Sequence, residues 1–121
     1  MHNARMPFKS ADSSLPLTPI SFEILLALLD GERHGYAILQ AVEHRLAGKL
    51  PLRTGTMYRA LARLLDEGLI ERAGPGTDED PRRRHYRITA HGRATARAEA
   101  RRLADQVDAA RAHRLLPESR R

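Results

Sequence analysis

The sequence contains no cysteine and no tryptophan, and it has few lysines and few aromatic residues. Without cysteine it can form neither a disulfide nor a thiolate zinc site, and it lacks a thiol nucleophile. Aromatic residues make up only 4% of the 121 positions, so a core must consist mainly of Leu, Ile, Ala and Val. Only Lys9 and Lys49 are lysines, which leaves arginine to carry nearly all of the positive charge.

Long hydrophobic segments are also missing. No apolar run approaches the roughly 20 residues that cross a bilayer. The first residues, MHNARMPFKSADSS, lack the apolar region of a secretory signal. We therefore expect a cytoplasmic protein that makes no contact with a membrane.

The chain does contain basic charge and enough apolar residues for one core. Its formal net charge is +6, and a length of 121 residues suits a single domain. An excess of arginine favours an acidic partner such as nucleic acid, because the planar guanidinium matches phosphate and guanine. Net charge says nothing about the fold, which has to be inferred from the hydrophobic pattern.

This pattern divides the chain into four parts. Residues 1–15 show no period and predict a flexible arm. Residues 16–89 contain three helices and a β-hairpin, residues 90–114 contain one further helix, and residues 115–121 form a tail. The predicted class is therefore mostly α with a small β component (α+β).

Two helices open the central part. Thr18 and Pro19 predict the start of the first, since Thr caps helices and Pro fits the first helical position. The residues up to Asp30–Gly31 are apolar on most sides, which predicts a helix at the centre of the core. The second helix is predicted to begin at the HGY triplet of residues 34–36 and to end at Gly48.

The third predicted helix has two different faces. Thr54 is the expected N-cap and Gly68 the expected stop. Arg59 and Arg63 lie one turn apart on one face, and a solvated surface is the ordinary reason for such a charge pattern. The other face is an apolar stripe that points to the core, made of Met57, Leu61, Leu64 and Leu65.

A two-stranded β-hairpin with a long tip is predicted next. Residues 69–72 and 84–89 are the strands, and the Gly-, Pro- and Asp-rich segment 73–83 is the loop between them. Three acidic residues at 78–80 nearly cancel the charge of the arginines at 82–84. We therefore expect a modest contribution of this loop to binding of a polyanion, with the acidic tip turned away.

The last predicted helix starts at the cap Thr89 and has a narrow apolar seam at heptad spacing. Its remaining faces are polar and include Glu99. So narrow an apolar seam suits packing against a partner helix, and we therefore expect a homodimer. The alternative is that the seam packs onto the chain's own first helix. The two arrangements can coexist. The predicted seam consists of Ala96, Ala100, Leu103, Val107 and Ala110.

Three short helices followed by a hairpin describe a winged helix-turn-helix, whose third helix enters the major groove of DNA. Double-stranded DNA is therefore the predicted partner. Tyr36 and Tyr58 are either core aromatics or donors of a hydroxyl to a phosphate. The predicted DNA-contacting residues are Tyr36, Arg53, Thr54, Gly55, Thr56, Tyr58, Arg59, Arg63, Arg82, Arg83 and Arg84.

Three motifs in a fixed order resemble those of a known family. The segments LTPISFEILLALLDGERHGYAIL, TGTMYRALARLLDEGLIE and RRRHYRITAHGR are similar to successive signatures of the PadR-like transcriptional regulators, over residues 17–93. The resemblance implies a winged-helix repressor of the compact branch that dimerises through its C-terminal helix and is often relieved by a small-molecule effector. It places the DNA-contacting helix at 54–63 and the wing at 72–87, where the acidic TDEDP segment departs from the family's pattern.

Other functions fit the sequence less well. A winged-helix module that docks proteins without binding DNA is the main alternative, but it would not need Arg59, Arg63 or the arginines at 82–84. An enzyme is not expected, because GxSxG, P-loop and paired-carboxylate motifs are missing. The six histidines lack metal-ligand spacing, so we predict no metal and no cofactor. The Ala-rich seam shows no aromatic pocket for an effector.

Overall fold

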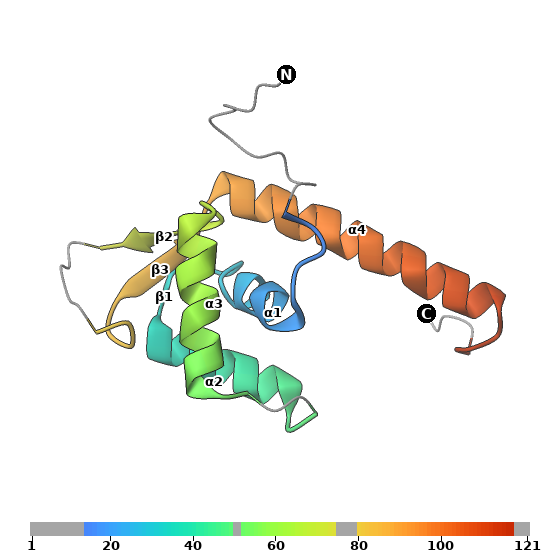
Figure 1. Ribbon diagram of the computed structural model, residues 1–121, viewed down its shortest axis with the longest axis horizontal. Helices are drawn as coiled ribbons and strands as arrows, with labels where there is room; N and C mark the ends of the chain where they lie inside the picture. The colour runs from blue at the N-terminus through green and yellow to red at the C-terminus, as the bar shows by residue number, and fades with distance from the viewer. Residues whose placement is uncertain (1–13, 50–51, 75–79, 118–121) are drawn as a thin grey trace, which may run out of the picture.

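The computed structural model describes residues 14–49, 52–74 and 80–117, and within them it contains four helices and one small antiparallel sheet (Figure 1). The predicted mostly helical class is confirmed. Most of the predicted arm, part of the predicted tail and the acidic residues 78–79 lie outside the described residues. In chain order the elements are α1 (Pro19–Ala27), β1 (Arg33–His34), α2 (Gly35–Leu46), α3 (Thr54–Asp66), β2 (Ile70–Ala73), β3 (His85–Ile88) and α4 (Ala90–Ala112).

Helix α1 is central, as its apolar circumference predicts. The Oγ1 of Thr18 accepts the backbone N–H of Ser21 at 3.1 Å and caps the helix, and Pro19 takes the first helical position. The helix then packs against α2, α3 and α4. The largest fully buried apolar residues of the core are Ile24, Leu25, Leu28, Ile38, Val42, Met57, Leu61, Leu64, Leu69, Ile70 and Tyr86.

The sheet has three strands, so the prediction of a two-stranded hairpin was incomplete. Strand β3 lies in the middle and pairs antiparallel with β2 on one side and with β1 on the other. The short strand β1 places Arg33 opposite Tyr86 and His34 opposite His85. The hairpin is thereby fixed to the start of α2, which follows β1 directly.

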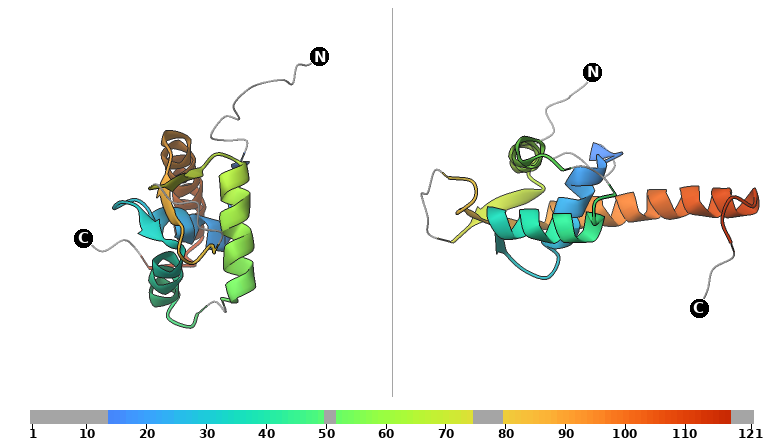
Figure 2. Two further views of the ribbon diagram at one scale, coloured as in Figure 1. Left: turned by 90° about the vertical axis from the view of Figure 1, so that its left-hand side faces the viewer. Right: turned by 90° about the horizontal axis from the view of Figure 1, so that it is seen from below.

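Helix α4 has a buried half and an exposed half. Its first part packs on the body, where Gly92 fits against the start of β2 so closely that a Cβ would overlap the carbonyl oxygen of Leu69. Most of the residues beyond position 99 are exposed, and Figures 1 and 2 show this part projecting away from the body. No helix in the described ranges combines the length and the apolar character of a bilayer-spanning segment.

The buried half corrects one prediction about α4. Glu99, which we expected on a polar face, is only 2% exposed. Its carboxylate accepts two hydrogen bonds from the guanidinium of Arg102, both at 2.8 Å. The predicted seam residue Ala96 is 6% exposed and belongs to the core of its own chain, so packing on the chain's own body does occur at this end of the seam.

Candidate nucleic-acid interface

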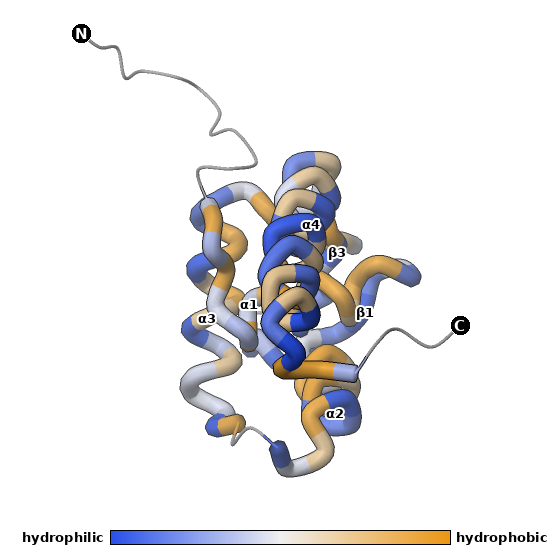
Figure 3. The backbone as a smooth tube through the Cα atoms, turned by 90° about the vertical axis from the view of Figure 1, so that its right-hand side faces the viewer, coloured by the Kyte–Doolittle hydropathy of each residue, from blue (hydrophilic) through white to orange (hydrophobic). Residues whose placement is uncertain are grey.

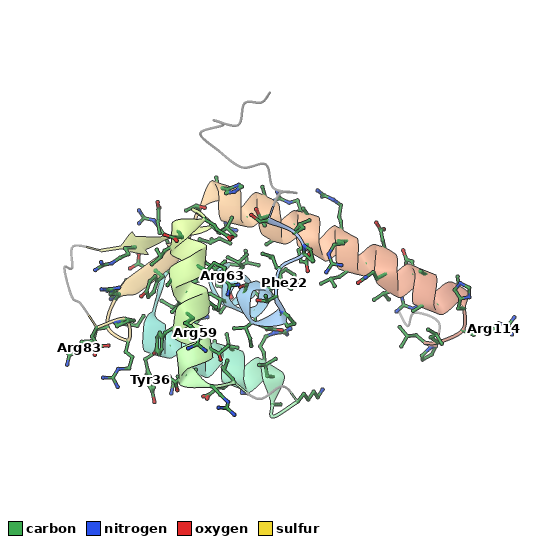
Figure 4. The ribbon with its side chains drawn as sticks, in the orientation of Figure 1. Phe22, Tyr36, Arg59, Arg63, Arg83 and Arg114 are labelled. Carbon is green, nitrogen blue, oxygen red and sulfur yellow. The ribbon has the colours of Figure 1, made fainter. Side chains whose placement is uncertain are left out.

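Helix α3 lies across one face of the molecule and presents its arginines outward. Met57, Ala60, Leu61 and Leu64 are buried beneath it, which fixes the rotation of the helix about its axis. Arg59 and Arg63 are consequently both exposed. Figure 4 shows the two side chains along the helix, on the side that faces the viewer. The two-faced character predicted for this segment is confirmed.

The N-terminal end of α3 is open to solvent. The N-cap is Arg53 rather than the predicted Thr54, and no side chain caps the helix here. The first backbone N–H groups of a helix have no partner within the helix, and together with the helix dipole they attract anions. Since residues 53–55 are all exposed, this end of α3 can accept a phosphate group.

Arg59 is held back toward this same end. Its Nη2 donates to Oγ1 of Thr56 at 3.4 Å, and its Nη1 lies 3.3 Å from the place where a Cβ of Gly55 would be. The missing side chain of Gly55 therefore leaves room for the guanidinium beside the first turn. Arg59 and the open N-terminus of α3 form one positively charged surface.

The basic end of the wing is attached to α2 through the backbone. The N–H of Gly35 donates to the carbonyl of Arg84 at 3.0 Å, and the N–H of Tyr36 donates to the carbonyl of Arg82 at 3.2 Å. A Cβ on Gly35 would overlap the carbonyl oxygen of Pro81. The glycine of the HGY triplet is thus required for the close approach of the wing, a role that cannot be seen from the sequence alone.

The side chains in this part of the wing carry paired charges. Asp80 accepts hydrogen bonds from the backbone N–H and the guanidinium of Arg82, and its carboxylate also lies 4.0 Å from Nε of Arg83. The hydrogen bonds from the Arg82 side chain are the largest cause of the lowered pKa of the Asp80 carboxyl. The same hydrogen bonds raise the pKa of the Arg82 guanidinium. Asp80 therefore partly neutralises the arginines, as the mixed charge of the loop predicts.

The two tyrosines proposed as phosphate contacts occupy different environments. Tyr36 is 53% exposed and lines a hollow of about 430 Å³ together with Asp80, Arg82 and Arg83. The hydroxyl of Tyr58 is instead buried and has no hydrogen-bond partner among the described residues. Burial is the main cause of its raised pKa. Tyr36 is therefore the tyrosine that can reach an external phosphate, whereas Tyr58 packs against the core.

Most of the predicted contact residues lie on one side of the body. Figure 4 shows Arg59 and Arg63 on α3, Tyr36 near the lower end of that helix, and Arg83 at the turn of the wing. Arg84 differs from its two neighbours because it is half-buried, whereas Arg82 and Arg83 are exposed. The arrangement brings a helix with a basic face, an open helix N-terminus and a basic turn into one surface.

A histidine pair lies at the junction of β1 and β3. The ring centroids of His34 and His85 are 3.9 Å apart, and Nδ1 of His85 lies 3.2 Å from a carboxylate oxygen of Glu32. This pair could not be predicted from the sequence, because a strand of two residues has no hydrophobic period. Within the part of the chain that the structure describes, no group of three or more metal-ligating side chains is present.

Comparison with known proteins identifies the family. The family description "Transcriptional regulator PadR-like family" matches residues 24–98, which is more than half of the chain. This chain belongs to the PadR-like family of transcriptional regulators. Its members regulate transcription and are not enzymes, in agreement with the expectation from the sequence.

Individual relatives of this PadR-like regulator share its fold at low identity. The chain is similar to a PadR family transcription regulator from hypervirulent Clostridium difficile, with a TM-score of 0.65 and 23% identity over 79% of this chain and 98% of that one. It is also similar to Bacillus subtilis PadR in complex with operator DNA, with a TM-score of 0.56 and 22% identity over 88% and 53% of the two chains. These similarities confirm the winged-helix fold.

A curated relative comes from Lysinibacillus sphaericus and is called Uncharacterized protein X. It is 31% identical to this PadR-like regulator over 71 residues, which is 59% of this chain and 65% of the relative. The chain therefore matches just under two thirds of that protein's length.

Proposed function

We propose that this PadR-like regulator is a cytoplasmic repressor that binds double-stranded DNA sequence-specifically as a homodimer. Helix α3 enters the major groove, where Arg59 and Arg63 contact base edges, and the wing lies along the flanking backbone. The observation that carries the proposal is the exposed arginine face of α3 beside the basic wing turn that is attached to α2. The complex of Bacillus subtilis PadR with operator DNA supports it by family analogy.

The backbone contacts follow from the same surface. The open N-terminus of α3 and the Tyr36 hydroxyl are suited to phosphate oxygens, which position a protein on the duplex without reading its sequence. Arginine is the residue that most often reads guanine, through a bidentate contact with its O6 and N7 atoms. The N-terminus of α3, Tyr36 and the wing therefore position the protein on the DNA backbone. The arginines of α3 read the base sequence.

The homodimer is supported by the exposed half of α4. Beyond Glu99 this half makes little contact with its own body, yet it carries apolar residues at heptad spacing, with Leu103 half-buried and Val107 36% exposed. An apolar seam on a projecting helix is stabilised by a second helix. A two-fold dimer also doubles the length of DNA that is read, which an isolated reading helix needs for operator specificity.

The proposal is tested by fluorescence anisotropy with DNA from upstream of the protein's own gene, against a scrambled duplex, at two salt concentrations. Sequence-selective binding with a strong salt dependence is expected, because each neutralised phosphate contributes a slope of about 0.9 in the log–log salt plot. Absence of binding to either duplex at low salt would contradict DNA binding and favour a protein-docking module. A reporter driven by the same upstream DNA should be expressed more strongly when the gene is deleted, whereas an activator would give the opposite change.

A further inference from the structure

Helix α3 presents one line of residues directly outward. Four residues on the opposite side of the helix are buried, and an α-helix has about 3.6 residues per turn. The positions diametrically opposite the buried ones, here called the outward line, are Gly55, Arg59, Ala62 and Asp66, and all four are exposed. Figure 3 shows hydrophobic and hydrophilic segments alternating along α3, at the edge of the molecule. In the proposed DNA complex the outward line faces the floor of the major groove.

The side chains on the outward line differ greatly in length. Gly55 has no side chain and Ala62 has only a methyl group, so the backbone of α3 can come close to base edges at these two positions. Arg59 is the one long side chain of the four, and its Nη2 donates to Oγ1 of Thr56 at 3.4 Å. This hydrogen bond directs the guanidinium toward the N-terminal end of the helix. The methyl group of Ala62 is therefore left exposed.

The two ends of the outward line are not equivalent for DNA. The N-terminal half of a recognition helix is the part that reaches base edges. At the other end, the exposed carboxylate of Asp66 and the negative end of the helix dipole oppose the approach of DNA, while Arg63 lies to one side of the line. In the proposed complex the segment from Gly55 to Ala62 is therefore the part of the line that lies deepest in the groove.

We infer that Ala62 recognises a thymine, through contact of its methyl group with the C5-methyl group of that base. The alanine side chain has no hydrogen-bonding group, and thymine is the base whose major-groove edge presents a methyl group. This contact rests on the proposed function and deepens it, because it adds a residue that determines specificity. Ala62 lies three positions beyond Arg59, about 4.5 Å along the helix axis. The thymine is therefore within about three base pairs of the guanine that Arg59 contacts.

Deoxyuridine tests the contact directly, because it differs from thymidine only in lacking the C5-methyl group. Selection from a pool of random duplexes supplies the DNA site that the unmodified protein prefers. Each thymine of this site is then replaced singly by deoxyuridine, and fluorescence anisotropy measures the dissociation constant of each duplex. Replacement of one particular thymine in a half-site is expected to weaken binding about fourfold, which corresponds to the loss of one buried methyl group.

An Ala62→Gly variant assigns this effect to Ala62. It should bind the duplex with the sensitive thymine and the matching deoxyuridine duplex equally, because the methyl group of the protein is gone. Glycine also lowers helix stability, but the ratio of two dissociation constants measured with one protein removes that contribution. Ala104→Gly is the matched control, since it makes the same change at an exposed position of α4 and should keep the fourfold ratio.

A second variant tests the contact without a glycine in the helix. Ala62→Asn replaces the methyl group by a polar amide, which pairs with adenine rather than with a thymine methyl. Repeated selection with this variant should lose the preference for thymine at the sensitive position and keep the preferences at the other positions. An unchanged preference for thymine would contradict the inference.

These measurements distinguish the failure of the thymine contact from the failure of the proposed function. If the selection with the unmodified protein enriches no sequence, sequence-specific DNA binding and the thymine contact are both overturned. If a site is enriched but none of its thymines is sensitive to deoxyuridine, the thymine contact alone is overturned. The same conclusion follows if Ala62→Gly keeps the fourfold ratio.

Discussion

The carboxylate of Asp80 accepts hydrogen bonds from both the backbone and the side chain of Arg82. Its Oδ1 accepts the Arg82 N–H at 3.0 Å and Nε at 3.3 Å, and its Oδ2 accepts Nη2 at 3.1 Å. An ionised carboxylate bound to a guanidinium in this way occupies a position that a DNA phosphate could take. Because these bonds lower the pKa of Asp80, the group stays ionised at neutral pH and, in the proposed DNA complex, competes with phosphate for Arg82.

The Asp80→Asn variant should therefore bind DNA more tightly, and more so for non-specific than for specific sequences. Once Asp80 no longer binds its side chain, Arg82 should contact one further phosphate. The slope of the logarithm of the DNA-binding constant against the logarithm of the salt concentration should then become steeper by about one. Anisotropy titrations over a salt series measure both effects. Glu71→Gln is the matched control, since Glu71 forms a similar pair with Arg87 at 2.6 Å within the strands of the same hairpin. Weaker binding by Asp80→Asn would show instead that Asp80 orients Arg82 for its contact.

Arg59→Ala should weaken specific DNA binding by about 1–3 kcal/mol if Arg59 makes a bidentate base contact. Arg63→Ala is expected to act in the same direction, because it lies one turn further along the same exposed face. Arg101→Ala, an exposed arginine on α4, removes the same charge and should change specific binding little. Unchanged affinity in both α3 variants would contradict the assignment of α3 as the reading helix.

Gly35→Ala should displace the wing from α2 while leaving α3 in place. The added Cβ overlaps the carbonyl of Pro81, and overpacking of this kind typically costs about 1–3 kcal/mol of stability. We expect lower DNA affinity. We also expect faster hydrogen exchange of the backbone amides in the wing residues that lie next to Gly35. Gly48→Ala is the control, since its strain arises from a φ of +79° in an open turn and should lower stability without changing DNA binding.

The hydrophobic pattern predicted the four helices and the paired strands β2 and β3, because these elements repeat apolar residues over several turns or alternations. It did not predict β1, since a strand of two residues, Arg33 and His34, has no period to detect. Thr54 resembles a helix cap as well as Thr18 does, and only the backbone shows that Arg53 takes that position. The exposed arginines of α3 were identified from the sequence, whereas the buried hydroxyl of Tyr58 and the burial of Glu99 depend on which elements cover them.

Leu103→Arg should dissociate the proposed homodimer, because it puts a charge into the apolar seam between the two α4 helices. Sedimentation velocity at micromolar concentration is expected to show a monomer with unchanged helix content by circular dichroism. The matched variant Arg101→Glu changes a charge on an exposed face of the same helix and should stay dimeric. An intact dimer for Leu103→Arg would exclude the seam as the interface.

Glu99 should make the stability of the fold sensitive to acid. The hydrogen bonds from Arg102 are the largest cause of its lowered pKa, and the backbone N–H of Leu17 acts in the same direction. A carboxyl whose pKa is lower in the folded state stabilises the fold above its unfolded pKa of about 4.3, and this stabilisation is lost as the pH falls through the folded value. Glu99→Gln should cost about 1–3 kcal/mol at neutral pH and reduce the loss of stability between neutral pH and pH 3. Urea unfolding at several pH values measures the difference, and parallel pH profiles would contradict it.

The length of α4 has a consequence for the DNA that the proposed dimer can recognise. The helix has 23 residues and is therefore about 34 Å long, and two-fold dimers that read DNA place their half-sites one helical turn or a multiple of it apart. The first half of the helix is fixed to the body, and the second half is paired with the other subunit in the proposed dimer. The helix therefore connects the two DNA-binding domains rigidly. The spacing of the operator half-sites would then be encoded in the length of this helix, and an insertion or deletion within it would change the preferred spacing while the residues that read bases stay the same.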